Sequence, residues 1–186
     1  AEVGFQSVAK TIDVLNGKQY METLNALRLE SNNPEGAIYT AEQIAAVGKG
    51  TNWQDEIFRV SAPVQNYQLS ISGGSDKHDY YLGLSYFDQQ GVVKLSSLKK
   101  YNVRANMNFT PKTFLRFKFN MNYTRTDGKS TYENMTGANE AAGPINSALQ
   151  FDPTLAPGID PETGRYRKNS FIALDNPQAL FIWYQS

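Results

Sequence analysis

The residues best suited to chemistry gather around the single histidine of the chain, His78, which lies between Asp76 and Asp79 in the stretch GGSDKHD. An imidazole beside carboxylates can bind a metal ion or act as a general base. Either role needs partners that converge from separate parts of a fold, and one short turn rarely supplies them. The spacing therefore predicts an exposed turn residue, with no metal site and no catalytic residue.

A second group of carboxylates lies in residues 152–162, which overlap the start of the sequence DPETGRY (160–166). The spacing D-x-[DN]-x-[DN]-G of a calcium loop is absent, and the acid pair of a glycosidase comes from separated strands. The chain has no cysteine, which excludes disulfides, thiolate metal sites and cysteine nucleophiles. SISGGS also lacks the G-x-S-x-G spacing of a nucleophile elbow. We therefore predict no enzyme activity and no cofactor.

The overall composition narrows the classes of partner. Eighteen basic residues balance eighteen acidic residues, so no net charge points to nucleic acid. No apolar run approaches the roughly 18–20 residues of a membrane helix. A membrane-crossing strand needs only every second residue to be apolar, so a barrel stays compatible with this composition.

Regular alternation of apolar and polar residues is the strongest pattern in the chain. It is clearest in YNVRANMNFTPKTFLRFKFNMNYTRT (101–126), where apolar residues occupy almost every second position on both sides of Pro111. The same period recurs in 66–72 and 80–87, and a loop is predicted at 88–100. The alternation predicts four antiparallel strands, each with one apolar and one polar face.

The two faces have different expected surroundings. In a membrane barrel the apolar set is lipid-facing: Leu69, Leu82, Leu84, Val103, Met107, Phe117, Phe119 and Met121. The polar set is then lumen-facing: Arg104, Asn106, Asn108, Arg116, Lys118, Asn120 and Asn122. A soluble β-sandwich, with the apolar set in its core, fits the same pattern. Strands of about 10 or more residues, and short turns that share one end while long connections share the other, favour the barrel.

Aromatic residues and helix signals mark the remaining features. Tyrosines near strand ends on the apolar face match an aromatic belt at a membrane interface: Tyr67, Tyr80, Tyr86, Tyr101 and Tyr123. The stretches NGKQYMETLNALRLES and TAEQIAAVGKG each begin with a capping box and predict short helices. Four aromatic residues of the predicted loops are possible ligand contacts, although packing anchors are the commoner role: Trp53, Tyr132, Phe151 and Tyr166.

Long motifs occur in order along the chain: WQDEIFR, NYQLSISGGSDK, YFDQQGV and KKYNVRANMN. With IDVLNGKQY, ALQFDPTLAPGIDPETGRY and LDNPQAL, they closely resemble the SusC/RagA family of TonB-dependent outer-membrane transporters. The resemblance covers nearly the whole chain. It implies an all-β fold, namely a segment of an antiparallel transmembrane β-barrel of 22 strands, with long external loops that contain short helices.

The resemblance also implies how the chain is divided. Residues 1–8 are expected to form the end of a barrel strand, and 9–62 an external loop with short helices. Residues 63–127 are expected to form four antiparallel barrel strands, 128–177 a long external loop, and 178–186 the start of the next strand. The plug domain and the rest of the barrel are expected outside this segment.

The function follows from the same resemblance. Such proteins import oligosaccharides or peptides across the bacterial outer membrane, together with a SusD-like surface lipoprotein. Energy comes from the TonB complex, which acts through the absent plug. The lipid bilayer and the substrate are therefore expected neighbours, and nucleic acid is not. A soluble β-sandwich carbohydrate-binding module is the alternative, and a secreted glycosidase domain is a third possibility.

Overall fold

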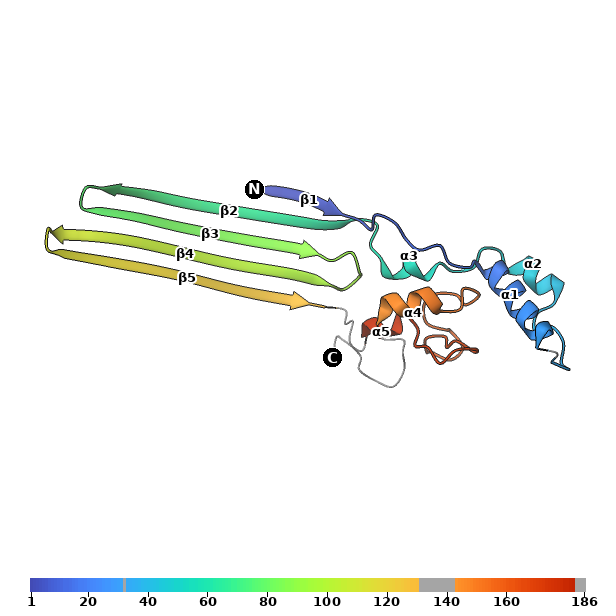
Figure 1. Cartoon of the computed structure of the whole chain (residues 1–186). Coiled ribbons are helices and arrows are strands. Elements are labelled where there is room, and N and C mark those ends of the chain that lie inside the picture. The colour runs from blue at the N-terminus through green and yellow to red at the C-terminus, as the bar shows by residue number, and fades with distance from the viewer. Residues whose placement is uncertain (32, 131–142, 183–186) are drawn as a thin grey trace. The chain divides into compact units, whose positions relative to one another are not determined.

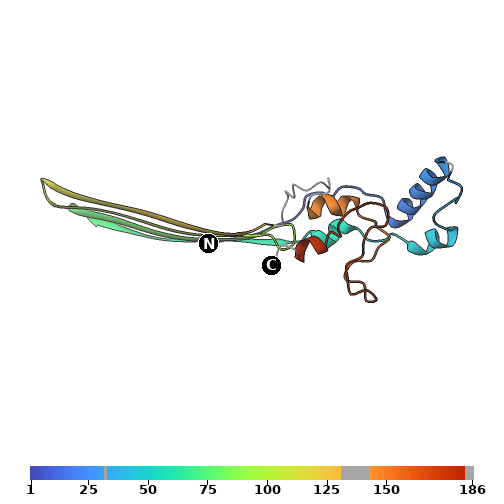
Figure 2. The same ribbon diagram turned by 90° about the horizontal axis from the view of Figure 1, so that it is seen from below.

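The computed structural model describes residues 1–31, 33–130 and 143–182, which divide into two compact units. The first, here called the sheet unit, comprises residues 1–7 and 59–130. It is a single antiparallel sheet in the order β1-β2-β3-β4-β5 (Figure 1). Figure 2 shows this sheet along its edge as one layer of strands. The strands are β1 Glu2–Gln6, β2 Ala62–Ser75, β3 His78–Gln90, β4 Ser97–Lys112 and β5 Leu115–Lys129.

The strands are long, and the alternation observed in the sequence runs through most of β2 to β5. β2 to β5 contain 14, 13, 16 and 15 residues, whereas a strand of a globular protein has about five to six. The main irregularity is a shift of register between Phe109 and Lys112. Pro111 lies inside it, and its lack of an N–H group suits a position where ladder pairing is interrupted.

The connections at the two ends of the sheet differ in length. Only Asp76 and Lys77 separate β2 from β3, and only Thr113 and Phe114 separate β4 from β5. At the opposite end, residues 91–96 join β3 to β4. The short turns are therefore at one end of the sheet, as the sequence predicts.

The connection between β3 and β4 is shorter than predicted. The sequence predicts a loop over 88–100, but the structure pairs Asp88 with Lys99 and Gln90 with Ser97. These four residues are polar, although they occupy the alternate positions that are apolar elsewhere in the same strands. The sequence pattern therefore disappears there, while the backbone hydrogen-bond ladder continues. Strand pairing is a property of the backbone, and the side-chain pattern marks only the part with an apolar face.

The second unit, here called the loop unit, comprises the described residues of 8–58 and 131–186. Its helices are α1 Gly17–Glu30, α2 Ala41–Val47, α3 Trp53–Ile57, α4 Pro144–Gln150 and α5 Ala179–Ile182. Both predicted capping boxes are confirmed, with Asn16 and Gln19 at the start of α1 and Thr40 and Gln43 at the start of α2. In the described ranges, no helix is long and apolar enough to span a bilayer.

The C-terminal end of the described chain differs from its prediction. The sequence predicts the start of a strand over 178–186, but residues 179–182 form helix α5, and 183–186 lie outside the described residues. The amide oxygen of Asn176 accepts a hydrogen bond from the N–H of Gln178 at 2.9 Å. Asn176 and the following Pro177 supply a helix start, and a short apolar run alone does not distinguish a helix from a strand.

Candidate functional site

Strand register decides which predicted site residues share a face of the sheet. Arg104 of β4 pairs with Asn122 of β5, Asn106 with Asn120, and Asn108 with Lys118. Residues paired directly across an antiparallel ladder point to the same side. All seven residues predicted as lumen-facing, including Arg116 of β5, therefore lie on one face, here called the wet face.

The residues predicted as lipid-facing lie together on the opposite face, here called the apolar face. The register aligns them in rows, such as Leu69, Leu84 and Val103, or Leu82 and Met121. The remaining three of this set are Met107, Phe117 and Phe119. Seven of the eight are exposed within the described structure, Leu69 at 70% and Phe117 at 55%. A row of large apolar side chains without protein cover indicates a surface that another medium or partner must cover.

A row of tyrosines bounds the apolar face at the end where β2 begins and β3 ends. Tyr67, Tyr86 and Tyr101 are direct cross-strand partners. The ring centroids of Tyr67 and Tyr86 are 6.3 Å apart, and those of Tyr86 and Tyr101 are 5.1 Å apart. This row joins three of the five tyrosines that the sequence assigns to an interface belt. Tyr80 and Tyr123 lie in other rows of the same face.

Charged residues replace apolar ones immediately beyond the tyrosine row. Asp88, Lys99 and Asp127 form the next cross-strand row, with 3.7 Å between the Lys99 ammonium and the Asp88 carboxylate. The hydroxyl of Tyr86 donates a hydrogen bond of 2.8 Å to Asp88. This charged row is absent from the sequence-based predictions, because residues 88–100 are predicted to form a loop. Extending the two-residue period onward from Tyr86 places Asp88 on the same face, and so identifies the row.

Hydrogen bonds connect side chains across the wet face. The amide nitrogen of Asn102 donates to the Ser85 hydroxyl at 2.9 Å, and its oxygen accepts from the Thr124 hydroxyl at 2.8 Å. Asn108 donates to the Asp79 carboxylate at 2.7 Å. These bonds fix the amide orientations, so the wet face carries preset donors and acceptors.

The histidine lies at the first position of β3. Its Nδ1 is 2.9 Å from the Ser75 hydroxyl across the turn, and its side chain is exposed. Within the described residues, no group of three or more His, Asp or Glu is arranged to hold a metal ion.

Hydrogen bonds from the WQDEIFR stretch and its neighbour Thr51 hold distant segments of the loop unit together. The Thr51 hydroxyl donates to the Leu155 carbonyl at 2.7 Å, and the Trp53 indole N–H donates to the Asp152 carbonyl at 2.9 Å. The Gln54 amide makes two bonds to one backbone residue, accepting from the Ile12 N–H at 2.9 Å and donating to the Ile12 carbonyl at 2.7 Å. Neighbouring residues of one short helix thus hold segments that are distant in sequence.

We predict that Gln54→Glu destabilises the loop unit by about 1–3 kcal/mol. Gln54 is 3% exposed, and a carboxylate there would lose the donor to the Ile12 carbonyl and place two oxygens against each other. Amide hydrogen exchange of the full-length protein should be faster in residues 9–15. Gln150→Glu, at an exposed position, should leave that exchange unchanged. Equal protection in both variants would contradict the role of Gln54.

The aromatic residues proposed as ligand contacts have different positions. Trp53 and Phe151 are 1% and 4% exposed, and their rings pack edge to face at 4.9 Å. The structure therefore gives both a packing role, because the indole finds its hydrogen-bond partner and its apolar neighbour inside the unit. Tyr166 is half-buried and pairs with Ile159 in an isolated bridge. Tyr132 lies outside the described residues.

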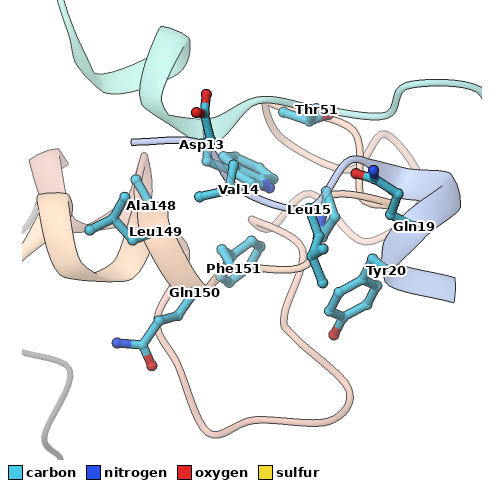
Figure 3. A pocket seen from close by; sticks show the side chains of 12 residues that line it. Asp13, Val14, Leu15, Gln19, Tyr20, Thr51, Ala148, Leu149, Gln150 and Phe151 are labelled. Carbon is cyan, nitrogen blue, oxygen red and sulfur yellow. The ribbon is translucent and has the colours of Figure 1, made fainter. Parts of the chain in front are cut away.

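A hollow of about 510 Å³ lies beside this aromatic pair in the loop unit. Figure 3 shows Leu15, Tyr20 and Phe151 around it. Burial, and then the negative charge of Asp152, raise the pKa of Tyr20 to about 12. The phenol therefore stays neutral, and keeps its O–H donor, to a higher pH than an ordinary tyrosine.

Comparisons with known proteins agree with this geometry. The chain is 33% identical over 180 residues to TonB-dependent receptor P3 of Formosa agariphila, covering 94% of this chain and 16% of that protein. It is also 33% identical over 182 residues to TonB-dependent receptor SusC of Bacteroides thetaiotaomicron, with the same coverage of both. The chain thus spans 16% of the length of these relatives. No protein-family model matches it.

Solved structures agree on the fold. A chain of the RagAB peptide importer in the open-open state superposes with a TM-score of 0.61 at 16% identity, covering 82% of this chain and 19% of that chain. The closed-closed state gives 0.59 at 18% identity, covering 82% and 20%. The resemblance found in the sequence is thus confirmed, and the chain belongs to the SusC/RagA family of TonB-dependent receptors.

Proposed function

We propose that this chain forms part of the wall and the external loops of an outer-membrane importer. In this proposal β1 to β5 belong to a closed barrel of 22 strands, with the apolar face toward lipid and the wet face toward the lumen. The loop unit is formed by external connections. The remaining strands and a plug come from parts of the protein outside this chain.

The exposed apolar face, bounded by the tyrosine row, is the observation that carries the proposal. A strand that crosses a bilayer at a tilt needs about 9–11 residues, and β2 to β5 have 13 to 16. Tyrosine suits the headgroup region, because its ring is apolar and its hydroxyl polar. The charged row beyond Tyr86 then falls where water and headgroups can solvate it.

The lengths of the connections also support the proposal. Outer-membrane barrels have short turns on the periplasmic side and longer loops outside. Here the turns at 76–77 and 113–114 share one end, and the chain between β1 and β2 leaves the other end. The loop unit would thus belong to the extracellular side.

The transported substrate and the partners are proposed by analogy with the relatives. One matched structure is named a peptide importer, and one relative is SusC. We propose import of oligosaccharides or peptides, a SusD-like lipoprotein as surface partner, and the TonB complex as energy source acting through the plug. Transport of this kind requires binding and movement, without covalent chemistry on the substrate.

Cell fractionation of the full-length protein tests this function. We expect the protein in the outer-membrane fraction, from which only detergent should extract it. We also expect its mobility on gels to change on heating, because a closed barrel resists unfolding in detergent until it is heated. A protein that stays in the soluble fraction, with no change on heating, would contradict the proposal and favour the soluble sandwich.

A further inference from the structure

Every charged residue on the wet face of β4 and β5 is basic. These residues are Lys100 and Arg104 on β4, and Arg116 and Lys118 on β5, and they are here called the basic track. All four side chains are exposed. The chain as a whole has no net charge, so this concentration of positive charge is local.

The basic track has no acidic counterpart of its own. None of the four residues forms an ion pair with any residue that the structure describes. On the apolar face of the same strands, Lys99 pairs with Asp88, and Arg125 with Asp127 at 3.1 Å. Acidic groups on the wet face lie on other strands, Glu2 on β1 and Asp79 on β3, and Asp79 already accepts from Asn108. The positive charge of the track is thus left for another partner.

The track runs along most of the sheet. Lys100 and Arg104 are four positions apart on β4, and Arg104 pairs with Asn122, which is four positions from Lys118 on β5. Arg116 lies two positions further on. With a rise of about 3.3 Å per residue, the charges extend over roughly 33 Å, about the thickness of a bilayer core. Asparagine amides fill the positions between them.

A hollow lies at the middle of the track. It has a volume of about 610 Å³ and is lined in part by Tyr81, Gly83, Asn102, Arg104 and Asn122. Gly83 leaves room for the Tyr81 ring, whose hydroxyl is 2.7 Å from the place where a Cβ would stand. The Arg104 guanidinium is 6.0 Å from the centroid of that ring, so cation, ring and amides converge at one place.

We propose that the basic track binds oligosaccharides that carry carboxylate groups and guides them along the inner wall. This inference rests on the proposed import function and names the substrate class. Spaced cations bind a chain of spaced carboxylates through charge-assisted hydrogen bonds. Amides both donate and accept, as sugar hydroxyl groups do, and the exposed Tyr81 ring offers an apolar surface for a sugar ring. These neutral contacts favour an acidic sugar over an acidic peptide.

Calorimetry on the full-length protein in detergent tests the inference without a mutation. The probes are tetragalacturonate, the neutral tetrasaccharide cellotetraose and tetraglutamate. We expect tetragalacturonate to bind at least about tenfold more tightly than the other two. Its affinity should fall as NaCl rises from about 50 to 500 mM, because salt screens exposed charges.

A matched pair of double variants locates the site. Arg104→Gln with Lys118→Gln removes two charges from the wet face and should weaken tetragalacturonate binding by about tenfold or more. Lys99→Gln with Arg125→Gln removes the same charge from the same two strands on the apolar face, and should leave binding unchanged. The heat-resistant gel form shows whether each variant is assembled.

Three results on assembled protein would overturn the inference. These are equal binding of the acidic and the neutral sugar, tighter binding of tetraglutamate, and equal losses in the two double variants. Absence of tetragalacturonate binding would also overturn the inference. It would indicate that the positive charge of the basic track instead pairs with a protein segment such as the plug. A wild-type protein absent from the outer membrane would instead contradict the proposed function, so the two failures are distinguishable.

Discussion

Ile71→Arg should destabilise the assembled protein by about 2–4 kcal/mol. Ile71 is 58% exposed on the apolar face, in the same cross-strand row as Leu82, Ala105 and Met121. This row is two rows from the tyrosines, well inside the apolar band. In the proposed barrel, a guanidinium at position 71 would move from water into hydrocarbon, and that transfer costs most at the middle of the bilayer.

The neighbouring residue supplies the control. Ser72 is also exposed, but it points to the wet face and pairs with Tyr81. Ser72→Arg should therefore cost little. Urea unfolding of both variants in lipid vesicles gives the two free energies, and the heat-resistant gel form gives the assembled fraction. Equal losses at positions 71 and 72, or none at 71, would contradict the assignment of the faces.

Trp53→Ala should destabilise the loop unit by about 3–5 kcal/mol. Trp53 is 1% exposed, packs against Phe151 and hydrogen-bonds the Asp152 carbonyl. Its removal leaves a cavity and an unpaired carbonyl group in the same place. Because local opening governs amide exchange, exchange in α3 and α4 should accelerate by roughly 100-fold or more.

Two further variants separate packing from a general effect of mutation. Trp53→Phe keeps most of the ring and loses the hydrogen bond, so its acceleration should be smaller. Ile159→Ala removes a side chain that is 55% exposed, and should leave exchange in α3 unchanged. Trp53→Ala with native exchange rates would show that the WQDEIFR stretch does not hold the loop unit together.

The sheet was predictable because its pattern repeats. One period of two residues predicts the strands and the face on which each side chain lies, whereas the register between strands depends on the turns as well. The pattern fails at Asp88 and Lys99, where the apolar face changes to charge while the ladder continues. Side-chain type there reports a change of surroundings rather than the end of a strand.

The loop unit was predictable only in part. The capping boxes at Asn16 and Thr40 are local signals, and both are confirmed. The hydrogen bonds between the Gln54 side chain and the Ile12 backbone join residues 42 positions apart, and no local pattern encodes such a contact. The burial of Trp53 and Phe151 likewise follows from tertiary packing, so their residue types alone were compatible with either a ligand contact or a core position.

Spin labels can measure directly whether each face of the sheet contacts lipid or water. Single cysteines, introduced one at a time at positions 116–123 of β5 in the full-length protein and labelled in lipid vesicles, report collisions with oxygen and with a water-soluble nickel complex. We expect oxygen to dominate at 117, 119, 121 and 123, and nickel at the positions between. Loss of this alternation, or odd positions shielded from both reagents, would show protein rather than lipid over the apolar face.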